Sequence, residues 1–249
     1  MESQTGQKPK HNVKKKKKIL RSAIRLFKTD GYYNVSIEDI VKASDSSTGS
    51  FYNYFGSKDE LVISYRRELL NSCHIFYKKL QKDSAYSDKN ALNKLQLLTV
   101  HILELLSSVG EEFGRVFTIH RLKETDAVPE DKPYLPLIME LVKSGQEDKS
   151  IRSDYSTREI AEIVDLFIIG CHIDWQIKRG AYIITESKSN TLDILFSNIS
   201  SSAEARKPKE MYFDEIWADA MSRTTKDFSS DIKLLEDQWL ERLYGNKPY

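Results

Sequence analysis

The sequence is poor in cysteine and has no long apolar run. Its two cysteines, Cys73 and Cys171, lie far apart and without ligand-type spacing, so we expect neither a disulfide framework nor a structural zinc site. A membrane-spanning helix needs about 18 or more apolar residues in succession, and the lysine-rich N-terminus is not followed by the apolar segment of a secretory signal. These features favour a protein of the reducing cytoplasm that is neither exported nor embedded in a membrane.

Signatures of the common enzyme classes are also missing. The sequence contains no Gly-x-Ser-x-Gly, His-Glu-x-x-His or Cys-x-x-Cys motif and no glycine-rich loop for a phosphate or a dinucleotide. His101, His120 and His172 have no paired spacing, so they are more typical of core histidines than of metal ligands. We therefore predict that the protein is not an enzyme and uses no cofactor and no metal.

Charge is distributed unevenly along the chain. Residues 8–28 contain ten Lys or Arg and no acid, which leaves 28 basic and 37 acidic residues in the remainder. The apolar residues of this basic segment recur at helical spacing, and the pattern predicts a helix from residue 14 that closes near Asp30 and Gly31, behind a flexible basic tail of residues 1–13. Cations at the start of a helix oppose its dipole, so they suggest binding to a polyanion rather than a contribution to stability. The candidate phosphate contacts here are Lys14, Lys15, Lys16, Lys17 and Lys18. A solvated tail that only aids solubility is the alternative.

Two short helices joined by a tight turn are predicted next. Ser36 and Asp39 form a capping-box pattern for a helix that ends near Ala43, and Asp45 suits a left-handed turn position. Ser47 can then cap a second short helix through residue 54. Two such helices behind a longer basic one make a helix-turn-helix.

On the second short helix the residue types separate by face. Phe51 and Phe55, four residues apart, are predicted to face the core. The remaining residues present small polar groups, tyrosine hydroxyls or a bare backbone position, and they are Ser47, Thr48, Gly49, Ser50, Tyr52, Asn53 and Tyr54. A tyrosine such as Tyr52 is equally suited to packing on the first helix. A new helix capped by Ser57 and Glu60 would place Lys58 beside its amide groups as a phosphate clamp.

Residues 31–62, GYYNVSIEDIVKASDSSTGSFYNYFGSKDELV, resemble the DNA-binding signature of the tetracycline-repressor (TetR) family of bacterial regulators. The resemblance covers about 50 residues when the basic helix is included. It implies phosphate contacts by Ser36, Ser47, Tyr52, Tyr54 and Lys58, and base contacts by Thr48, Ser50 and Asn53. The chain departs from the family pattern at Asp45-Ser46, where Gly-Val is usual, so we expect a looser turn there.

The rest of the chain is predicted to be helical. The expected fold is all-α, with a helix-turn-helix domain at residues 14–60 and a helical regulatory and dimerisation domain at residues 61–203. Predicted helices include one long helix over about residues 62–80, and another that begins near two prolines and ends at Gly145.

Residues 157–180 form a predicted helix that is apolar nearly all round, so it must be covered on more than one side. Packed with residues 190–200 against a second copy, it would build a four-helix dimer interface, as the family resemblance also implies. Burial within one large monomer is the alternative. The predicted interface residues are Val164, Phe167, Ile168, Gly170, Cys171, Leu192, Leu195, Phe196 and Ile199.

The resemblance further implies an inducer site inside the regulatory domain. Residues that could line an apolar pocket, or equally be plain core, are Leu69, Phe76, His101, Phe113, Phe117, His120 and Trp175. The expected partners are operator DNA, a second copy of the chain and an apolar or amphipathic small molecule. The expected function is a DNA-binding transcription regulator, a repressor released from a palindromic operator by that molecule.

Two alternatives to this function remain open, and so does the role of residues 204–249. A helical enzyme or ligand-binding protein would leave the basic helix unexplained, and a ligand-independent DNA-binding protein would have little use for a large apolar domain. Residues 204–249 carry two further amphipathic patterns. This extension could cover the dimer, reach across it or bind a partner.

Overall fold

The computed structural model describes residues 8–123 and 132–202, and the side chains from residue 14 onward. Within these residues the secondary structure is helical apart from an isolated antiparallel bridge between Ile151 and Ser200. The chain divides into two compact units, with a boundary between Arg66 and Arg67 inside one helix. The boundary expected from the sequence, after residue 60, falls in the first turn of the same helix. Both helices predicted beyond residue 203 lie outside the described residues.

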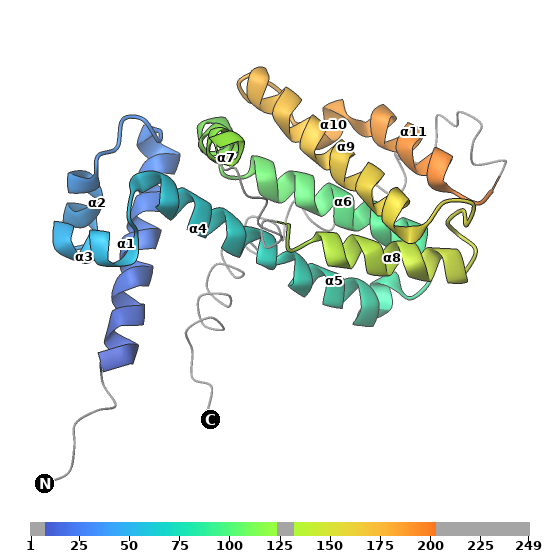
Figure 1. Ribbon diagram of the computed structural model, residues 1–249, viewed down its shortest axis with the longest axis horizontal. Helices are drawn as coiled ribbons and strands as arrows, with labels where there is room; N and C mark the ends of the chain where they lie inside the picture. The colour runs from blue at the N-terminus through green and yellow to red at the C-terminus, as the bar shows by residue number, and fades with distance from the viewer. Residues whose placement is uncertain (1–7, 124–131, 203–249) are drawn as a thin grey trace, which may run out of the picture. The chain divides into compact units, whose positions relative to one another are not determined.

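The first unit contains a three-helix motif and the start of a fourth helix. Its elements are α1 (Lys8–Asp30), α2 (Ile37–Ala43), α3 (Thr48–Tyr54) and the beginning of α4 (Lys58–Asn71). Figure 1 shows α2 and α3 packed beside α1. The helix α1 starts at Lys8 rather than at the predicted residue 14, so residues 8–13 extend the basic helix instead of forming a tail.

Local sequence signals fix the ends of these helices as predicted. Gly31 has a φ of 83°, and its amide donates to the carbonyl of Phe27 to close α1. Ser36 and Asp39 form the complete capping box of α2. Asp45 takes the left-handed turn position with a φ of 46°. Apolar residues from α1, α2, α3 and α4 then meet in one small core that includes Ile19, Phe27, Ile40, Phe51, Phe55 and Leu61.

The second unit is a helical bundle built around α6. Its helices are α5 (Cys73–Lys82), α6 (Ala91–Ser107), α7 (Glu111–Lys123), α8 (Leu135–Glu147), α9 (Thr157–Ile177), α10 (Ile184–Ser187) and α11 (Ser189–Ile199), with a short 3-10 turn at Ser84–Tyr86. Figure 1 shows α6, α8 and α9 running side by side, and α5, α10 and α11 also pack on α6. Leu98, Ile102 and Leu103 of α6 are completely buried at the centre.

Two predicted helices have different bounds in the structure. The long helix expected over residues 62–80 is interrupted at Ser72, which separates α4 from α5. The Ser72 hydroxyl and amide both donate to the Leu69 carbonyl, and such local bonds compete with the regular helical pattern. The helix expected to end at Gly145 continues to Glu147. Gly145 lies inside α8, at a point where the Ile151 side chain packs closely against the helix. A Cβ at residue 145 would lie 2.5 Å from the Ile151 side chain.

Candidate functional site

The α3 helix presents a polar, uncharged surface. Phe51 and Phe55 are buried, which turns Thr48, Tyr52 and Asn53 toward solvent. Tyr52 is 53% exposed, and its ring lies edge-to-face against the Phe51 ring, with the ring centroids 5.6 Å apart. A Cβ on exposed Gly49 would meet no atom within 4 Å, which leaves the start of α3 open to close approach by another molecule.

The position of α3 is fixed by its cap and by the preceding turn. The Ser47 hydroxyl oxygen accepts from the Ser50 amide at 3.2 Å and lies 2.9 Å from the Ser50 hydroxyl oxygen. In the turn, the Ser46 amide donates to the Val41 carbonyl at 2.8 Å. The Ser46 hydroxyl also donates to the Ser44 carbonyl at 3.2 Å. The expectation of a looser turn is therefore corrected, because these hydrogen bonds hold the Asp45-Ser46 segment in place.

Lysines from α1 lie next to this turn and the end of α3. The Lys18 ammonium is 3.5 Å from the Asp45 carboxylate, in an exposed ion pair. The Lys16 ammonium lies 5.3 Å from the centroid of the Phe55 ring. Lys14 is also exposed, whereas Lys15 and Lys17 are half-buried. The predicted basic residues thus share one unit with α3, and part of the group lies close to it.

Lys58 is placed differently from the predicted phosphate clamp. Its ammonium donates to the carbonyl oxygens of Tyr32 and Val35, at 2.8 Å in each case, and lies 4.2 Å from the centroid of the Tyr32 ring. Partial burial lowers the pKa of Lys58. This corrects the sequence expectation: the side chain holds the α1–α2 loop, because two carbonyl oxygens of that loop and one aromatic ring attract the ammonium inward. The predicted Ser57 cap is present, because the Ser57 hydroxyl oxygen accepts from the Glu60 amide at 3.0 Å. The Glu60 carboxylate accepts from the Gly56 amide, one residue before the cap, at 3.0 Å.

The α1–α2 loop adds an exposed tyrosine that the sequence did not single out. Tyr32 and Tyr33 are adjacent, but Tyr32 is buried while Tyr33 is 55% exposed. The pair "YY" gives no periodicity from which the exposed ring could be chosen. Of the other predicted contacts, Ser36 is engaged in the cap of α2 and Tyr54 is half-buried.

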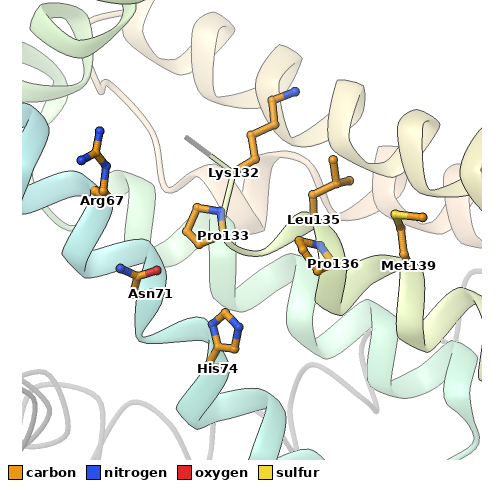
Figure 2. A pocket seen from close by; sticks show the side chains of 8 residues that line it. All are labelled: Arg67, Asn71, His74, Lys132, Pro133, Leu135, Pro136 and Met139. Atoms are coloured by element: carbon orange, nitrogen blue, oxygen red, sulfur yellow. The ribbon is translucent and has the colours of Figure 1, made fainter. Parts of the chain in front are cut away.

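The second unit contains a pocket with a volume of about 460 Å³. One wall is formed by Arg67 and Asn71 of α4 and His74 of α5, and the other by the start of α8 and the residues before it (Figure 2). This second wall comprises Lys132, Pro133, Leu135, Pro136 and Met139. None of the seven residues predicted to line a pocket is among them.

Those seven residues belong largely to the packing of the bundle. Phe76 stacks on His101 with ring centroids 4.1 Å apart, and Trp175 donates from its indole to the Tyr182 carbonyl at 2.9 Å. Burial lowers the pKa of His101 to about 3, so its ring is neutral. Phe113 is buried, and Leu69, Phe117 and His120 are half-buried. The pocket was missed because its lining includes polar and proline residues that give no apolar periodicity.

Most of the predicted dimer-interface side chains lie inside the subunit. Val164, Ile168, Cys171, Leu192, Phe196 and Ile199 are buried within the chain itself, and Phe167 and Leu195 are half-buried. The prediction is corrected for the six buried residues, because they face α6 and the other helices of the bundle. The apolar side chains on the outside of α9 are instead Ile163, Leu166, Ile173 and Ile177.

Exposed Gly170 lies on the same outer side of α9 as these residues. A Cβ at Gly170 would meet no atom within 4 Å in the subunit. We call Ile163, Leu166, Gly170, Ile173 and Ile177 the α9 stripe; they recur three and four residues apart, and Leu166 is 65% exposed. On α11, Ile194 is likewise 64% exposed.

Metal-binding clusters and membrane-spanning helices are not found in the described part of the chain. Residues 8–123 and 132–202 contain no group of three His, Cys, Asp or Glu side chains arranged to hold a metal ion. No helix in these ranges has the length and apolar character needed to span a bilayer.

Some known proteins match only a short part of this chain, and others match most of it. The HTH-type transcriptional regulator YvdT of Bacillus subtilis (strain 168), described as uncharacterized, is 40% identical over 62 residues, which are 25% of this chain and 32% of the relative. Two other curated regulators are matched over 28% and 17% of their length. The HTH-type transcriptional repressor DhaR of Mycobacterium sp. (strain GP1) is 25% identical over 199 residues, covering 75% of this chain and 92% of DhaR.

A solved structure shows the same fold. The TetR-family repressor FadR of Thermus thermophilus, in complex with lauroyl-CoA, superposes with a TM-score of 0.57 at 21% identity, over 73% of this chain and 93% of FadR. Residues 19–65, which hold the helix-turn-helix and the lysine-bearing helix, match the model of the bacterial regulatory proteins of the tetR family. Residues 19–65 of this chain therefore form a DNA-binding domain of the tetR family of bacterial regulatory proteins.

Proposed function

We propose that this protein represses transcription by binding a palindromic operator as a homodimer, and that a small amphipathic molecule releases it. The observation that carries the proposal is the exposed face of α3, where Thr48, Asn53 and Tyr52 surround a bare backbone position at Gly49. The helix has no charged residue, so its side chains suit hydrogen bonding to base edges in the major groove.

Phosphate contacts would set the position of α3 on the duplex. The lysines of α1 supply cations near the α2–α3 turn, and the exposed side chain of Tyr52 adds a neutral hydroxyl group. Lys58 has no part in this proposal, because its ammonium is directed to two backbone carbonyls. Ser36 and Ser47 act through the caps that hold α2 and α3 in place.

The α9 stripe would form the centre of the dimer interface. Its exposed isoleucines and leucine are costly to leave in water, and Gly170 would let a second α9 approach closely. A two-fold axis would place two copies of α3 on one face of the duplex, which suits an inverted repeat. Ile194 of α11 would extend the same interface.

Release by a small molecule is supported by the pocket of the second unit and by the relatives. FadR of Thermus thermophilus was solved with lauroyl-CoA, and DhaR is named a repressor. The pocket described above, with a volume of about 460 Å³, lies in the usual range for small-molecule sites. An effector there would shift the protein toward a form that binds the operator less tightly.

Selection from randomised duplex DNA, followed by hydroxyl-radical footprinting, tests this function. We expect one inverted repeat to be enriched, with protection of two half-sites about one helical turn apart and two protomers per duplex. Enrichment of a single unpaired half-site would remove the dimer from the proposal. Protection without any sequence preference would instead indicate a general DNA-binding protein.

A further inference from the structure

The apolar wall of the pocket lies at the start of α8 and is open to solvent. Pro133, Leu135, Pro136 and Met139 contribute carbon and sulfur atoms to this wall, and Met139 is 38% exposed. The exposed residues further along α8 are all charged, and they are Glu140, Lys143 and Glu147. An apolar partner is therefore expected at the start of α8 rather than at its end.

This wall is held in place before any partner binds. Buried Asp165 of α9 accepts a hydrogen bond from the Tyr134 hydroxyl at 2.9 Å and also contacts the Lys132 ammonium. Both donors belong to the segment that leads into α8. A wall fixed in this way loses little conformational freedom when a partner arrives, which favours binding.

Residues 211–221, MYFDEIWADAM, have the sequence pattern of a helix that packs on such a wall. Phe213, Ile216, Trp217, Ala220 and Met221 recur at spacings of three and four residues, which predicts one apolar face. Residues 210–221 contain four acidic residues and no basic one, and the pocket lining contains no acidic side chain that would repel them. The sequence thus supplies an apolar helix face whose charge is compatible with the pocket.

The described chain ends beside the opposite end of α8. The Ser201 amide donates to the Ser150 carbonyl at 3.2 Å, and Ser150 lies shortly after the last residue of α8, Glu147. The pocket lies at the other end of this helix, whose 13 residues are about 20 Å long. Residues 203–210 span up to about 26 Å when extended, so residues 211–221 are able to reach the pocket of their own subunit.

The pocket has the size and the polar groups for a tryptophan side chain. Its volume of about 460 Å³ accommodates one large ring system. Figure 2 shows Asn71 and His74 across the pocket from Pro133 and Pro136. An indole between these walls would lay its rings on the prolines, and its N–H group would have the side-chain oxygen of Asn71 as an acceptor. Trp217 lies in the middle of the predicted apolar face, so it is the side chain that fits this position.

We propose that residues 211–221 dock on this pocket of their own subunit, with Trp217 inserted between the α4–α5 wall and the Pro133–Met139 wall. The docking is supported by the pocket, by the sequence pattern and by the reach of residues 203–210. It goes beyond the function proposed above and adds one consequence that rests on that function: a small-molecule effector and the docked segment compete for one site.

The reactivity of a thiol on the apolar wall tests the docking. Met139→Cys introduces this thiol into the full chain, in which the native Cys73 and Cys171 are buried. Adding Trp217→Ala should raise the rate of modification by a bulky maleimide about tenfold or more, because the loss of a buried aromatic anchor releases the segment. Adding Trp239→Ala instead, a matched change elsewhere in the C-terminal extension, should leave the rate within about twofold.

A second thiol position controls for a general change in the bundle. Asn190→Cys places a thiol on an exposed residue of α11 outside the pocket, and its rate of modification should not respond to Trp217→Ala. Met139 and Asn190 are both exposed, so circular dichroism should show the parent's helical content for Met139→Cys and for Asn190→Cys.

A cross-link identifies the chain that supplies the segment. Lys143 is exposed one turn after Met139, and Ala218 lies on the polar side of the predicted helix. A short bismaleimide should join the thiols of Lys143→Cys and Ala218→Cys within one chain, and the product should keep the monomer mass on a denaturing gel. The pair Asn190→Cys and Ala218→Cys should not be joined.

Three results would overturn the proposal: equal modification rates for Met139→Cys with and without Trp217→Ala, an acceleration by Trp239→Ala as large as by Trp217→Ala, or a cross-link that forms only between chains or not at all. A cross-link between chains would assign the pocket to a segment of a second copy. These results are distinct from a failure of the regulator function, which footprinting reads on DNA without any thiol reagent. A protein that selects an operator but fails these tests would retain its proposed function and lose this docking.

Discussion

The Lys58 ammonium lies 2.8 Å from the carbonyl oxygen of Val35, at the end of the loop that joins α1 to α2. The same ammonium reaches the Tyr32 carbonyl, and the Tyr32 hydroxyl donates to the Asp59 carboxylate. Burial and this carboxylate raise the pKa of Tyr32, so the hydroxyl remains protonated as the donor. The first turn of α4 thus holds the loop through two neighbouring side chains.

Replacing Lys58 should therefore weaken folding. Lys58→Gln removes two hydrogen bonds from a charged donor, and we expect the free energy of unfolding to fall by about 1–2 kcal/mol, since the site is partly open to solvent. Urea unfolding followed by circular dichroism measures this, with exposed Lys42→Gln as the control. If the urea midpoint is unchanged while operator affinity falls, Lys58 contacts phosphate instead.

The lysines of α1 should contribute affinity without sequence preference. Changing Lys14, Lys15, Lys16, Lys17 and Lys18 to Gln should flatten the dependence of log affinity on log salt, by about 0.9 for each phosphate that the variant no longer neutralises. Fluorescence anisotropy at several salt concentrations gives the slope. The triple variant Lys78→Gln, Lys82→Gln, Lys143→Gln removes exposed cations of the second unit and should keep the parent slope. An unchanged slope in the α1 variant would exclude these lysines from the interface.

Asn53 and Ser47 should affect DNA binding in different ways. Asn53→Ala removes an exposed amide from α3 and should relax the preference at one or two symmetric operator positions, at about 1–3 kcal/mol per bidentate contact. Ser47→Ala removes the cap of α3, so it should cost about 0.5–2 kcal/mol of stability and weaken all operators alike. Affinities for a set of single-position operator variants separate the two patterns. Uniform weakening by Asn53→Ala would assign Asn53 to the backbone.

Sequence reasoning succeeded where the signal was local. The Ser36–Asp39 box, the Gly31 terminus, the left-handed Asp45 and the Ser47 cap depend on residues within a few positions of one another, and all were confirmed. Phe51 and Phe55 were assigned to the core correctly because a helix places residues four apart on one face.

Sequence reasoning failed where the position of a side chain or a pocket depends on residues far apart in sequence. The α9 helix is apolar on both its inner and outer sides, so its pattern alone does not distinguish Val164, which faces the core, from Leu166, which faces outward. Lys58 is turned inward by the Tyr32 and Val35 carbonyls, 26 and 23 residues earlier. The pocket is lined by residues of α4, α5 and α8, and the hydrophobic periodicity of each segment does not indicate which helices lie next to one another.

The α9 stripe should be necessary for dimerisation. Leu166→Glu places a charge on an exposed position, so the monomer should keep its helical circular dichroism while sedimentation shows dissociation. Loss of operator binding should follow, because separate recognition helices no longer bind together. Leu122→Glu, at an exposed leucine of α7, is the matched control and should remain dimeric. A dimeric Leu166→Glu variant would place the interface elsewhere.

Glu104 of α6 should make stability depend on pH. Burial raises the pKa of Glu104 to about 7, compared with 4.5 for an unperturbed glutamate. The folded state then keeps the proton that the unfolded state loses, so this group's contribution to stability is present below pH 4.5 and is lost as pH rises through 7.

Glu104→Gln should remove this dependence. The variant should be more stable than the parent at pH 8, by up to about 3 kcal/mol, and nearly equal to it at pH 4.5. Urea unfolding at several pH values measures the difference, with exposed Glu147→Gln as the control. A difference between parent and Glu104→Gln that does not vary with pH would show that Glu104 ionises normally in the folded protein.

The most direct test of the account is the ratio of affinities for the selected inverted repeat and for a shuffled duplex of the same length, at one salt concentration. If α3 reads bases as proposed, the parent should prefer the inverted repeat by at least about 1,000-fold. Asn53→Ala should reduce that ratio while leaving affinity for the shuffled duplex unchanged. A ratio near one for the parent would contradict sequence-specific recognition by α3.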